Sequence, residues 1–413
     1  MRDTELYAQI LGLQSPWEVV HVDLDRSSSS VVVQVAAAAG TAFACPTCGQ
    51  PAAGYDRRER RWRHLDTCQY TTILQAQVLR VTCAVHGVVT VPVPWAEPGS
   101  SFTQLFEAIV VAWLKEASIQ AVSRQLRVSW SSIDRIMARA VARGMARRDR
   151  LQPTRLCVDE TSFQKRHEYV TVVTDPDAGH VLHVADERRT TRLESFYKGL
   201  DDAQKAAITG VSMDMWPAFI TATLRHIPEA ETKIAFDKFH VAKLLGDAVD
   251  KVRRQEHRQL GAEGTDVLKG SKYAWLTNAE NMTAAQRRRF IALRDSALKT
   301  ARAWAIKDLA MGLWHYRSRT WAMKAWKRWL RWALRCRLAP IKAAAVTIKR
   351  HLWGLLNAIV LDLHNGHAES MNSRIQRIQQ RACGFRNRDR FRNAIYFHLG
   401  GLDLSPSGAA VTA

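Results

Sequence analysis

The chain has 413 residues, of which 47% are hydrophobic, and a formal charge of +21 from 60 basic and 39 acidic side chains. Its length predicts two to four domains. The positive excess exceeds what solubility requires and indicates a nucleic-acid partner, with an anionic membrane surface as the rival. The sequence contains no apolar stretch long enough to span a membrane and no signal-peptide core, so we expect a cytoplasmic protein without a membrane partner.

The first motif is a pair of metal-binding knuckles. Residues 17–36 predict two short strands, and they are followed by Cys45 and Cys48 in CPTCG; after a further strand-like segment come Cys83 and His86 in CAVHG. Two ligands from each knuckle can converge on one tetrahedral ion, so we expect a structural Zn²⁺ in a zinc ribbon. Seven cysteines fit a reducing compartment with a metal site better than a disulfide scaffold.

Two features lie between the knuckles. An arginine-rich patch covers residues 57–63, and Cys68 follows it. Cys68 is either an alternative metal ligand or a buried thiol. The patch is a second candidate for contact with DNA phosphates.

Residues 100–148 change to helical periodicity. Ser118 and Ser129 are suited to be helix N-caps, and QLRVS is a tight link between two short helices. This is the layout of a helix-turn-helix, in which the second helix, near residues 129–143, enters a major groove. The candidates for contact with base edges are Ser131, Ser132 and Arg135.

From about residue 151 the predicted order of elements is β-β-β-α-β-α-β-α, which is the order of the ribonuclease H-like fold. In that topology the first and fourth strands are parallel neighbours, and we expect Asp159 to close the first and Asp214 to close the fourth. Ligands gather beyond the carboxyl ends of such strands, so the two carboxylates can share a metal. Asp237 and His240 are expected at the end of the fifth strand, either as a polar pair supporting the site or as a helix cap and a packed histidine.

Residues 246–355 are helical in pattern and rich in tryptophan. A basic amphipathic helix pair is broken at Pro340, and Trp326 and Trp329 are spaced for packing between helices. The same pattern would suit an amphipathic helix on a membrane surface. We favour a helical insertion whose basic outer side contacts DNA.

Residues 364–387 are rich in arginine but contain a single acid, Glu369. On a helix, Glu369 would lie opposite an apolar stripe and away from the arginine flank; the stripe consists of Met371, Ile375, Ile378 and Ala382. Together with Asp159 and Asp214, Glu369 gives the minimum number of carboxylate ligands for two hard cations, Mg²⁺ or Mn²⁺. Two such ions can promote in-line displacement at phosphorus. The expected phosphate contacts are Arg374, Arg377 and Arg381.

With these motifs the sequence resembles DDE transposases of bacterial insertion sequences, of the ISL3 type. The matching segments are CPTCG with CAVHG, the helix-turn-helix, VDETSF, SMDMWPAF, AFDKFHVAKL, LKGSKYAWL and HAESMNSRIQ with ACGFRN. The resemblance implies a catalytic triad of Asp159, Asp214 and Glu369 on a ribonuclease H-like fold, interrupted by a helical insertion. His86 departs from a ribbon of four cysteines.

The resemblance also implies a function. Such a protein binds the inverted repeats at both ends of its element, hydrolyses the 3′ strand at each, and uses the freed 3′-OH to attack target DNA. Its partners would be double-stranded DNA, both transposon ends and target, and further copies of itself in a dimer or higher oligomer at the bacterial nucleoid. The alternatives are a catalytically inactive DNA-binding regulator and a stand-alone nuclease.

The sequence therefore predicts a multidomain α+β protein. The expected segments are a zinc ribbon at 1–98, a helix-turn-helix at 99–150, the first part of the catalytic core at 151–245, an all-α insertion at 246–355, the last core helices at 356–401 and a disordered tail at 402–413.

Overall fold

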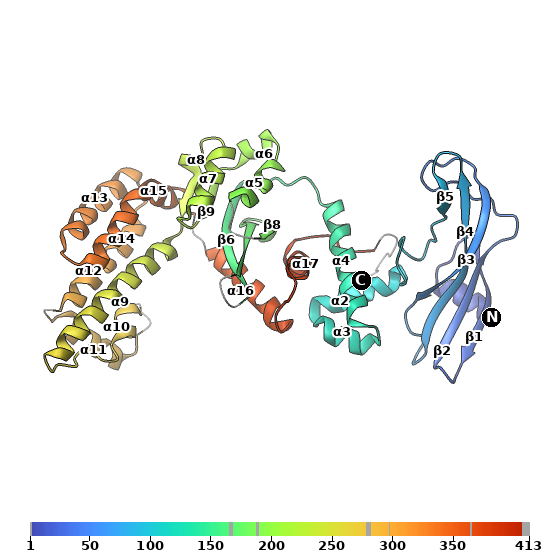
Figure 1. Cartoon of the computed structure of the whole chain (residues 1–413), viewed down its shortest axis with the longest axis horizontal. Helices are drawn as coiled ribbons and strands as arrows, with labels where there is room; N and C mark the ends of the chain where they lie inside the picture. The colour runs from blue at the N-terminus through green and yellow to red at the C-terminus, as the bar shows by residue number, and fades with distance from the viewer. Residues whose placement is uncertain are drawn as a thin grey trace. The chain divides into compact units, whose positions relative to one another are not determined.

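The computed structural model describes residues 2–164, 168–186, 190–277, 282–296, 298–363 and 366–406. Two compact units make up the chain (Figure 1). The first comprises Met1–Arg148, Tyr396–His398 and Leu402–Ala413, and the second comprises Asp149–Ile395 and Leu399–Gly401.

The first unit begins with a small helix and a five-stranded sheet. Its elements are α1 (Asp3–Ile10), β1 (Trp17–Asp25), β2 (Ser30–Ala37), β3 (Ala53–Arg63), β4 (Thr71–Cys83) and β5 (Gly87–Thr90). The strand order is β1-β2-β4-β3, with β5 also paired to β4. Alternating valines of β2 face a core in which Trp95 meets Trp17 and Trp62 edge to face, with ring centroids 4.9 and 5.5 Å apart.

Strand β3 was not predicted. Its sequence reads as a charged patch, yet residues 53–63 pair antiparallel with β4. Trp62, only 1% exposed, anchors the strand in the core, and Arg60 and Arg63 turn inward to backbone carbonyls of Ser100 and His64. Because a β-ladder binds backbone to backbone, it tolerates arginines whose heads remain in solvent on the outer face.

Three helices complete the first unit: α2 (Gln104–Glu116), α3 (Ile119–Leu126) and α4 (Trp130–Arg147). Ser118 caps α3 and Ser129 caps α4, each accepting a hydrogen bond from a backbone N–H three residues later. Both predicted N-caps are therefore confirmed. Helix α4 extends four residues beyond the predicted recognition helix, to Arg147.

Part of the segment predicted as a disordered tail packs on α4. Residues 402–406 lie along this helix, where the Arg143 guanidinium donates to the Leu404 carbonyl at 3.2 Å and Arg147 pairs with Asp403 at 3.1 Å. The Leu404 side chain is buried. The prediction is wrong for these residues because their partners are on a distant helix that local composition cannot reveal; the remainder of the expected tail lies outside the described residues.

The second unit is built on another five-stranded sheet with flanking helices. Its first elements are β6 (Arg155–Gln164), β7 (Glu168–Asp175), β8 (His180–Asp186), α5 (Thr190–Lys198), α6 (Asp202–Ala207), β9 (Gly210–Met213), α7 (Pro217–His226), α8 (Ala230–Lys233) and β10 (Ile234–Phe236). The strand order is β10-β9-β6-β7-β8, with β9 parallel to both β10 and β6 and with β7 antiparallel to both neighbours. This is the predicted ribonuclease H-like topology, and the predicted fold class is confirmed.

The remaining helices of the second unit follow. They are α9 (Lys238–Ala262), α10 (Lys272–Leu276), α11 (Ala284–Arg294), α12 (Lys299–Gly312), the short 3-10 helix η2 (Leu313–His315), α13 (Arg319–Arg335), α14 (Ala339–Arg350), α15 (Leu352–Leu361), α16 (Gly366–Arg381) and α17 (Arg388–Leu399). The long helix α9 leaves the sheet and packs against α12 and α14 (Figure 1). One hydrophobic core continues from the sheet into these helices.

The tryptophans of α13 divide as expected for packing between helices. Trp326 and Trp329 are fully buried, whereas Trp321 and Trp332 are exposed beside basic residues of the outer face. Within the described part of the chain, no helix has the length and apolar character needed to cross a membrane.

Candidate active site and DNA-binding surfaces

Three aspartates occupy one level at an edge of the second sheet. The parallel pairing of β6 with β9 matches Cys157 to Ser212, and the same register extended by two residues sets Asp159 beside Asp214. Strand β10 matches Phe236 to Met213, so Asp237 is the next position along the same edge. The topology thus brings together carboxylates far apart in sequence.

The structure corrects the predicted position of Asp159. It does not close its strand, because β6 continues to Gln164 through its antiparallel pairing with β7. Asp214 does follow the end of β9, and the Trp216 N–H donates to its Oδ1 at 3.0 Å. Asp159 lies two residues past Cys157, the last residue of β6 that pairs with β9, and well before the end of the strand.

Helix α16 carries Glu369 to this edge. One turn after Glu369, the Asn372 amide donates to Asp159 Oδ2 at 2.9 Å, which ties the helix to β6. Burial, with the charges of Asp214 and Asp237, raises the pKa of Asp159 to about 6. Partial burial and Asp237 also raise the pKa of Glu369.

Asp237 and His240 are the charged groups that act on both Asp159 and Glu369. Asp237 is nearly fully buried and caps α9 by accepting from the Phe239 N–H at 3.1 Å. His240 lies in the first turn of α9, 3.9 Å from Asp237, and not at a strand end as predicted. Asp237 is therefore a helix cap, as one of the two alternatives held, and its charge also acts on Asp159 and Glu369; a supporting role in the site stays a prediction.

The carboxylates are gathered but not closed to metal-ligand distance. Among the described residues, the single group of three or more metal-ligating side chains whose ligand atoms lie within 4.8 Å of one another is in the zinc ribbon. Asp159, Asp214 and Glu369 do not form such a group. A cluster of like charges around a buried aspartate is nevertheless an arrangement that a bound cation would stabilise.

The zinc-ribbon group consists of Cys45, Cys48, Cys83 and His86. The Cys83 sulfur lies 3.5 Å from His86 Nδ1 and 3.6 Å from the Cys48 sulfur. Backbone N–H groups of Cys48 and Thr47 lower the pKa of the Cys45 thiol to about 6, which favours the thiolate that binds metal. These distances and donor types fit one tetrahedral Zn²⁺.

Each knuckle needs its glycine. Gly49 and Gly87 follow the second ligand of each knuckle and have φ of +72° and +66°, a region that other residues rarely adopt. At the first knuckle the Gly49 N–H donates to the Cys45 carbonyl at 2.8 Å, which closes the turn. Cys68 is exposed and is not a member of the group, so it is neither a ligand in this structure nor a buried thiol.

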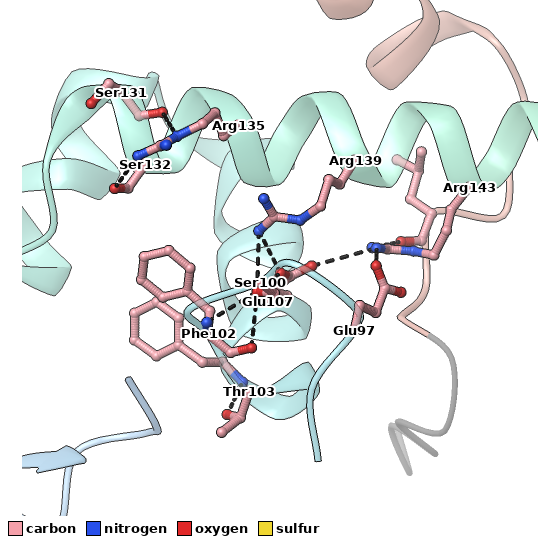
Figure 2. A network of polar contacts seen from close by, with 12 residues as sticks. Glu97, Ser100, Phe102, Thr103, Glu107, Ser131, Ser132, Arg135, Arg139 and Arg143 are labelled. Atoms are coloured by element: carbon pink, nitrogen blue, oxygen red, sulfur yellow. Dashed lines mark hydrogen bonds and ion pairs between the residues drawn. The ribbon is translucent and has the colours of Figure 1, made fainter. Parts of the chain in front are cut away.

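The helix-turn-helix is held by a buried acid. Glu107 of α2, only 1% exposed, accepts from Arg139 at 2.5 Å and from Ser100 at 2.8 Å, and it lies 3.4 Å from Arg143 (Figure 2). Arg143 also pairs with Glu97 at 2.6 Å. Arg139 and Arg143 therefore turn toward the interior, and this part of the predicted recognition helix is committed to packing.

The first half of α4 presents the predicted base readers. Ser131 and Arg135 are exposed, and Ser132 is half-buried. The Arg135 guanidinium folds back to the Ser131 carbonyl at 3.3 Å and the Ser132 hydroxyl at 3.4 Å, away from the Glu107 network (Figure 2). The three side chains share the N-terminal end of α4, where recognition helices contact bases.

The arginines predicted to contact phosphate lie on α16. Arg377 and Arg381 are exposed and Arg374 is half-buried, while Met371 and Ile375 pack inward. The predicted apolar stripe ends before Ala382, which is exposed beyond the helix. Glu369 and these arginines thus share one helix without sharing its buried face.

A zinc ribbon, a helix-turn-helix and a ribonuclease H-like core with a helical insertion, carried on one chain, define a DNA transposase. Residues 156–395 match a family described as transposase of the ISL3 type, residues 91–141 match the helix-turn-helix domain of transposase family ISL3, and residues 41–86 match the zinc-finger of transposase IS204/IS1001/IS1096/IS1165. The chain belongs to the ISL3 family of insertion-sequence transposases. It is therefore a DNA-binding enzyme of DNA cleavage and transfer, as the sequence motifs predicted.

Two named relatives cover most of the chain. The transposase for insertion sequence element IS1557 of Mycobacterium tuberculosis, in two strains, is 29% identical over 94% of this chain and 93% of its own length. The transposase for insertion sequence element IS1001 of Bordetella parapertussis is 26% identical over 84% of this chain and 86% of its own. Neither comparison favours the alternative of an inactive regulator.

We predict that the purified chain holds one zinc ion and that Cys48→Ser releases it. Cys48 is exposed, so its loss removes a ligand without opening the core. The measurement is zinc by elemental analysis after dialysis against EDTA, beside Cys68→Ser as the matched control. Equal zinc retention in Cys48→Ser and Cys68→Ser would contradict the ligand assignment.

We also predict that Glu107→Gln loosens the helix-turn-helix. Removing one partner of a buried ion pair costs about 3–5 kcal/mol, and here Arg139 loses its counter-charge while Arg143 keeps only Glu97. Hydrogen exchange of the full chain should show faster exchange in α2 and α4. Glu18→Gln, an exposed position on β1, should leave exchange unchanged. Wild-type protection of α4 in Glu107→Gln would show that the network is dispensable.

Proposed function

We propose that Asp159, Asp214 and Glu369 are the catalytic carboxylates with which this transposase cleaves its element's ends and joins them to target DNA. The observation that supports this most directly is the parallel register of β6 and β9, which sets Asp159 and Asp214 side by side. The Asn372–Asp159 hydrogen bond supports the third member, because it fixes the helix of Glu369 to the same edge.

The donor set suits Mg²⁺ or Mn²⁺. All three proposed ligands are carboxylates, the hard oxygen donors that these ions prefer. Burial, and to a smaller extent the charges of Asp214 and Asp237, raise the pKa of Asp159, and a bound cation would oppose both effects. Divalent ions bound there would activate the attacking oxygen and stabilise the leaving one. The proposed ligands are Asp159, Asp214 and Glu369.

The protein's own groups orient these carboxylates. Asp159 Oδ1 accepts from the Glu160 N–H at 2.8 Å while Oδ2 accepts from Asn372. Asp214 accepts from the Trp216 N–H. Backbone donors of this kind hold a carboxylate in one orientation and reduce the reorganisation that metal and DNA binding require.

Three surfaces would hold the DNA. The N-terminal half of α4 would read the terminal inverted repeats, and the α16 arginines would hold phosphates near the carboxylates. The outer face of α13 adds exposed Lys324, Arg328 and Arg331 between Trp321 and Trp332, and this helix contains no acid. Basic and aromatic side chains in one stripe suit nucleic-acid contact.

The reaction also bears on assembly and location. An element has two ends and each requires an active site, so we expect at least two copies of the chain on DNA. Each would cut the 3′ strand with water and then direct the 3′-OH to the target. The protein would act at the bacterial nucleoid, in the cytoplasm.

Asp159→Asn, Asp214→Asn and Glu369→Gln should each abolish nicking of an end-bearing duplex in Mg²⁺, because each removes a proposed cation ligand. End binding should stay near wild type. The measurements are a nicking assay and a mobility shift, with Asp202→Asn, an exposed aspartate of α6, as control. Near-wild-type nicking by any of the three variants would exclude that residue from the triad.

Two sets of substitutions should separate sequence reading from general affinity. Replacing Ser132 and Arg135 with alanine should erase the preference for terminal-repeat DNA over scrambled DNA, with little effect on salt dependence. Replacing Arg374, Arg377 and Arg381 should weaken binding to any DNA and reduce the salt slope by about 0.9 for each phosphate that the protein no longer neutralises.

Binding titrations at several salt concentrations test both variants against each other. If the Ser132/Arg135 variant keeps its preference, the helix-turn-helix is not the reader. Recognition would then pass to the exposed arginines of β3 or to the helical insertion.

A further inference from the structure

A cavity of about 860 Å³ opens beside the candidate active site in the second unit. Its walls come from α9, α10, α12, η2 and α15 with the residues after it. Sites of about 300–1,000 Å³ bind small molecules, so this cavity can hold a group as large as a nucleotide.

The first turns of α9 separate the cavity from the carboxylates. Lys238, Phe239 and Lys243 line the cavity, and at 100° per residue they lie on one side of the helix. Asp237 and His240 lie on roughly the opposite side, where they act on Asp159 and Glu369. A helix with side chains is about 10–12 Å across, which corresponds to about three stacked nucleotide steps.

The cavity has an aromatic and apolar lining. Phe239 is 50% exposed although it stands beside the hydrophobic core. Met311 and Trp314 line the cavity from the α12 side. The Trp314 indole N–H is closed to solvent, so Trp314 can offer a ligand in the cavity only its ring.

The charge of the lining is positive. The lining contains three lysines, Lys238, Lys243 and Lys307, against two aspartates, Asp247 and Asp362. Lys307 is half-buried, and its ammonium forms no ion pair with another described residue, although Asp308 lies near enough to act on it electrostatically. Burial lowers the pKa of Lys307, as expected for a cation that has lost water without gaining a partner. An anionic ligand would supply that partner.

We propose that this cavity binds one nucleotide displaced from the DNA duplex next to the cleavage point. The base would stack on Phe239 and Trp314, and its phosphates would lie near Lys238, Lys243 and Lys307. Aromatic faces accept any base, and displacement costs only a few kcal/mol, which stacking can offset. This inference rests on the proposed function, because it takes the sheet edge at Asp159 as the place where DNA is cleaved. The displaced nucleotide should then lie within about three positions of the cleavage point.

The test uses the full chain and end-bearing DNA that contains 2-aminopurine at one of the three positions on either side of the cleavage point. Ca²⁺ replaces Mg²⁺ to keep the DNA intact. At saturation of the mobility shift, one position should change its fluorescence several-fold, because the base leaves its stack. Phe239→Ala should lose this change, and Tyr273→Ala, an exposed aromatic of α10 outside the cavity, should keep it.

No response at any position, or an equal response in Phe239→Ala, would overturn the proposal. Asp159→Asn distinguishes this failure from failure of the catalytic assignment. That variant should lose nicking and keep the fluorescence change. If Asp159→Asn loses nicking but wild type shows no fluorescence change, only the cavity proposal is rejected. If Asp159→Asn nicks normally and the fluorescence change depends on Phe239, only the catalytic role of Asp159 is rejected.

Discussion

The parallel pairing of β6 with β9 is the constraint on which the rest of the second unit depends. It sets Asp159 beside Asp214, and the pairing of β9 with β10 adds Asp237 at the same level. Like charges at one edge oppose folding. The sheet tolerates them because backbone N–H groups and the Asn372 amide bind their oxygens and because His240 lies nearby. The cluster therefore contributes no stability of its own, and a bound cation would relieve its repulsion.

Helix α4 of the helix-turn-helix shows the same separation of buried and exposed charge. Glu107 holds Arg139 and Arg143 against α2, so the second half of α4 is rigidly placed. Arg135, only one turn earlier, remains exposed. A helix fixed at one end by buried ion pairs can present the other end to a groove with little loss of conformational freedom. In α9 a comparable division sets Asp237 toward the carboxylates and Phe239 toward the cavity.

The features that could be predicted from the sequence are those whose geometry depends on a few neighbouring residues. Ser118 and Ser129 cap helices because their hydroxyls serve the adjacent backbone, and the knuckles are short enough to determine their own geometry. The order of elements predicted the sheet. By contrast, β3 could not be found, because its ladder with β4 is non-local and its composition is that of a solvated patch. The place of Asp159 within β6 and the contribution of Asp237 follow from pairings that only the folded sheet establishes. Residues 402–406 likewise depend on partners across the chain.

Whether Asp159, Asp214 and Glu369 hold the catalytic ions can be tested by anomalous diffraction from crystals of the transposase bound to end DNA and grown with Mn²⁺. We expect anomalous density against these three carboxylates, and its loss in Asp159→Asn crystals of the same form. Density elsewhere on the chain with none at this edge, or density unchanged in Asp159→Asn, would contradict it.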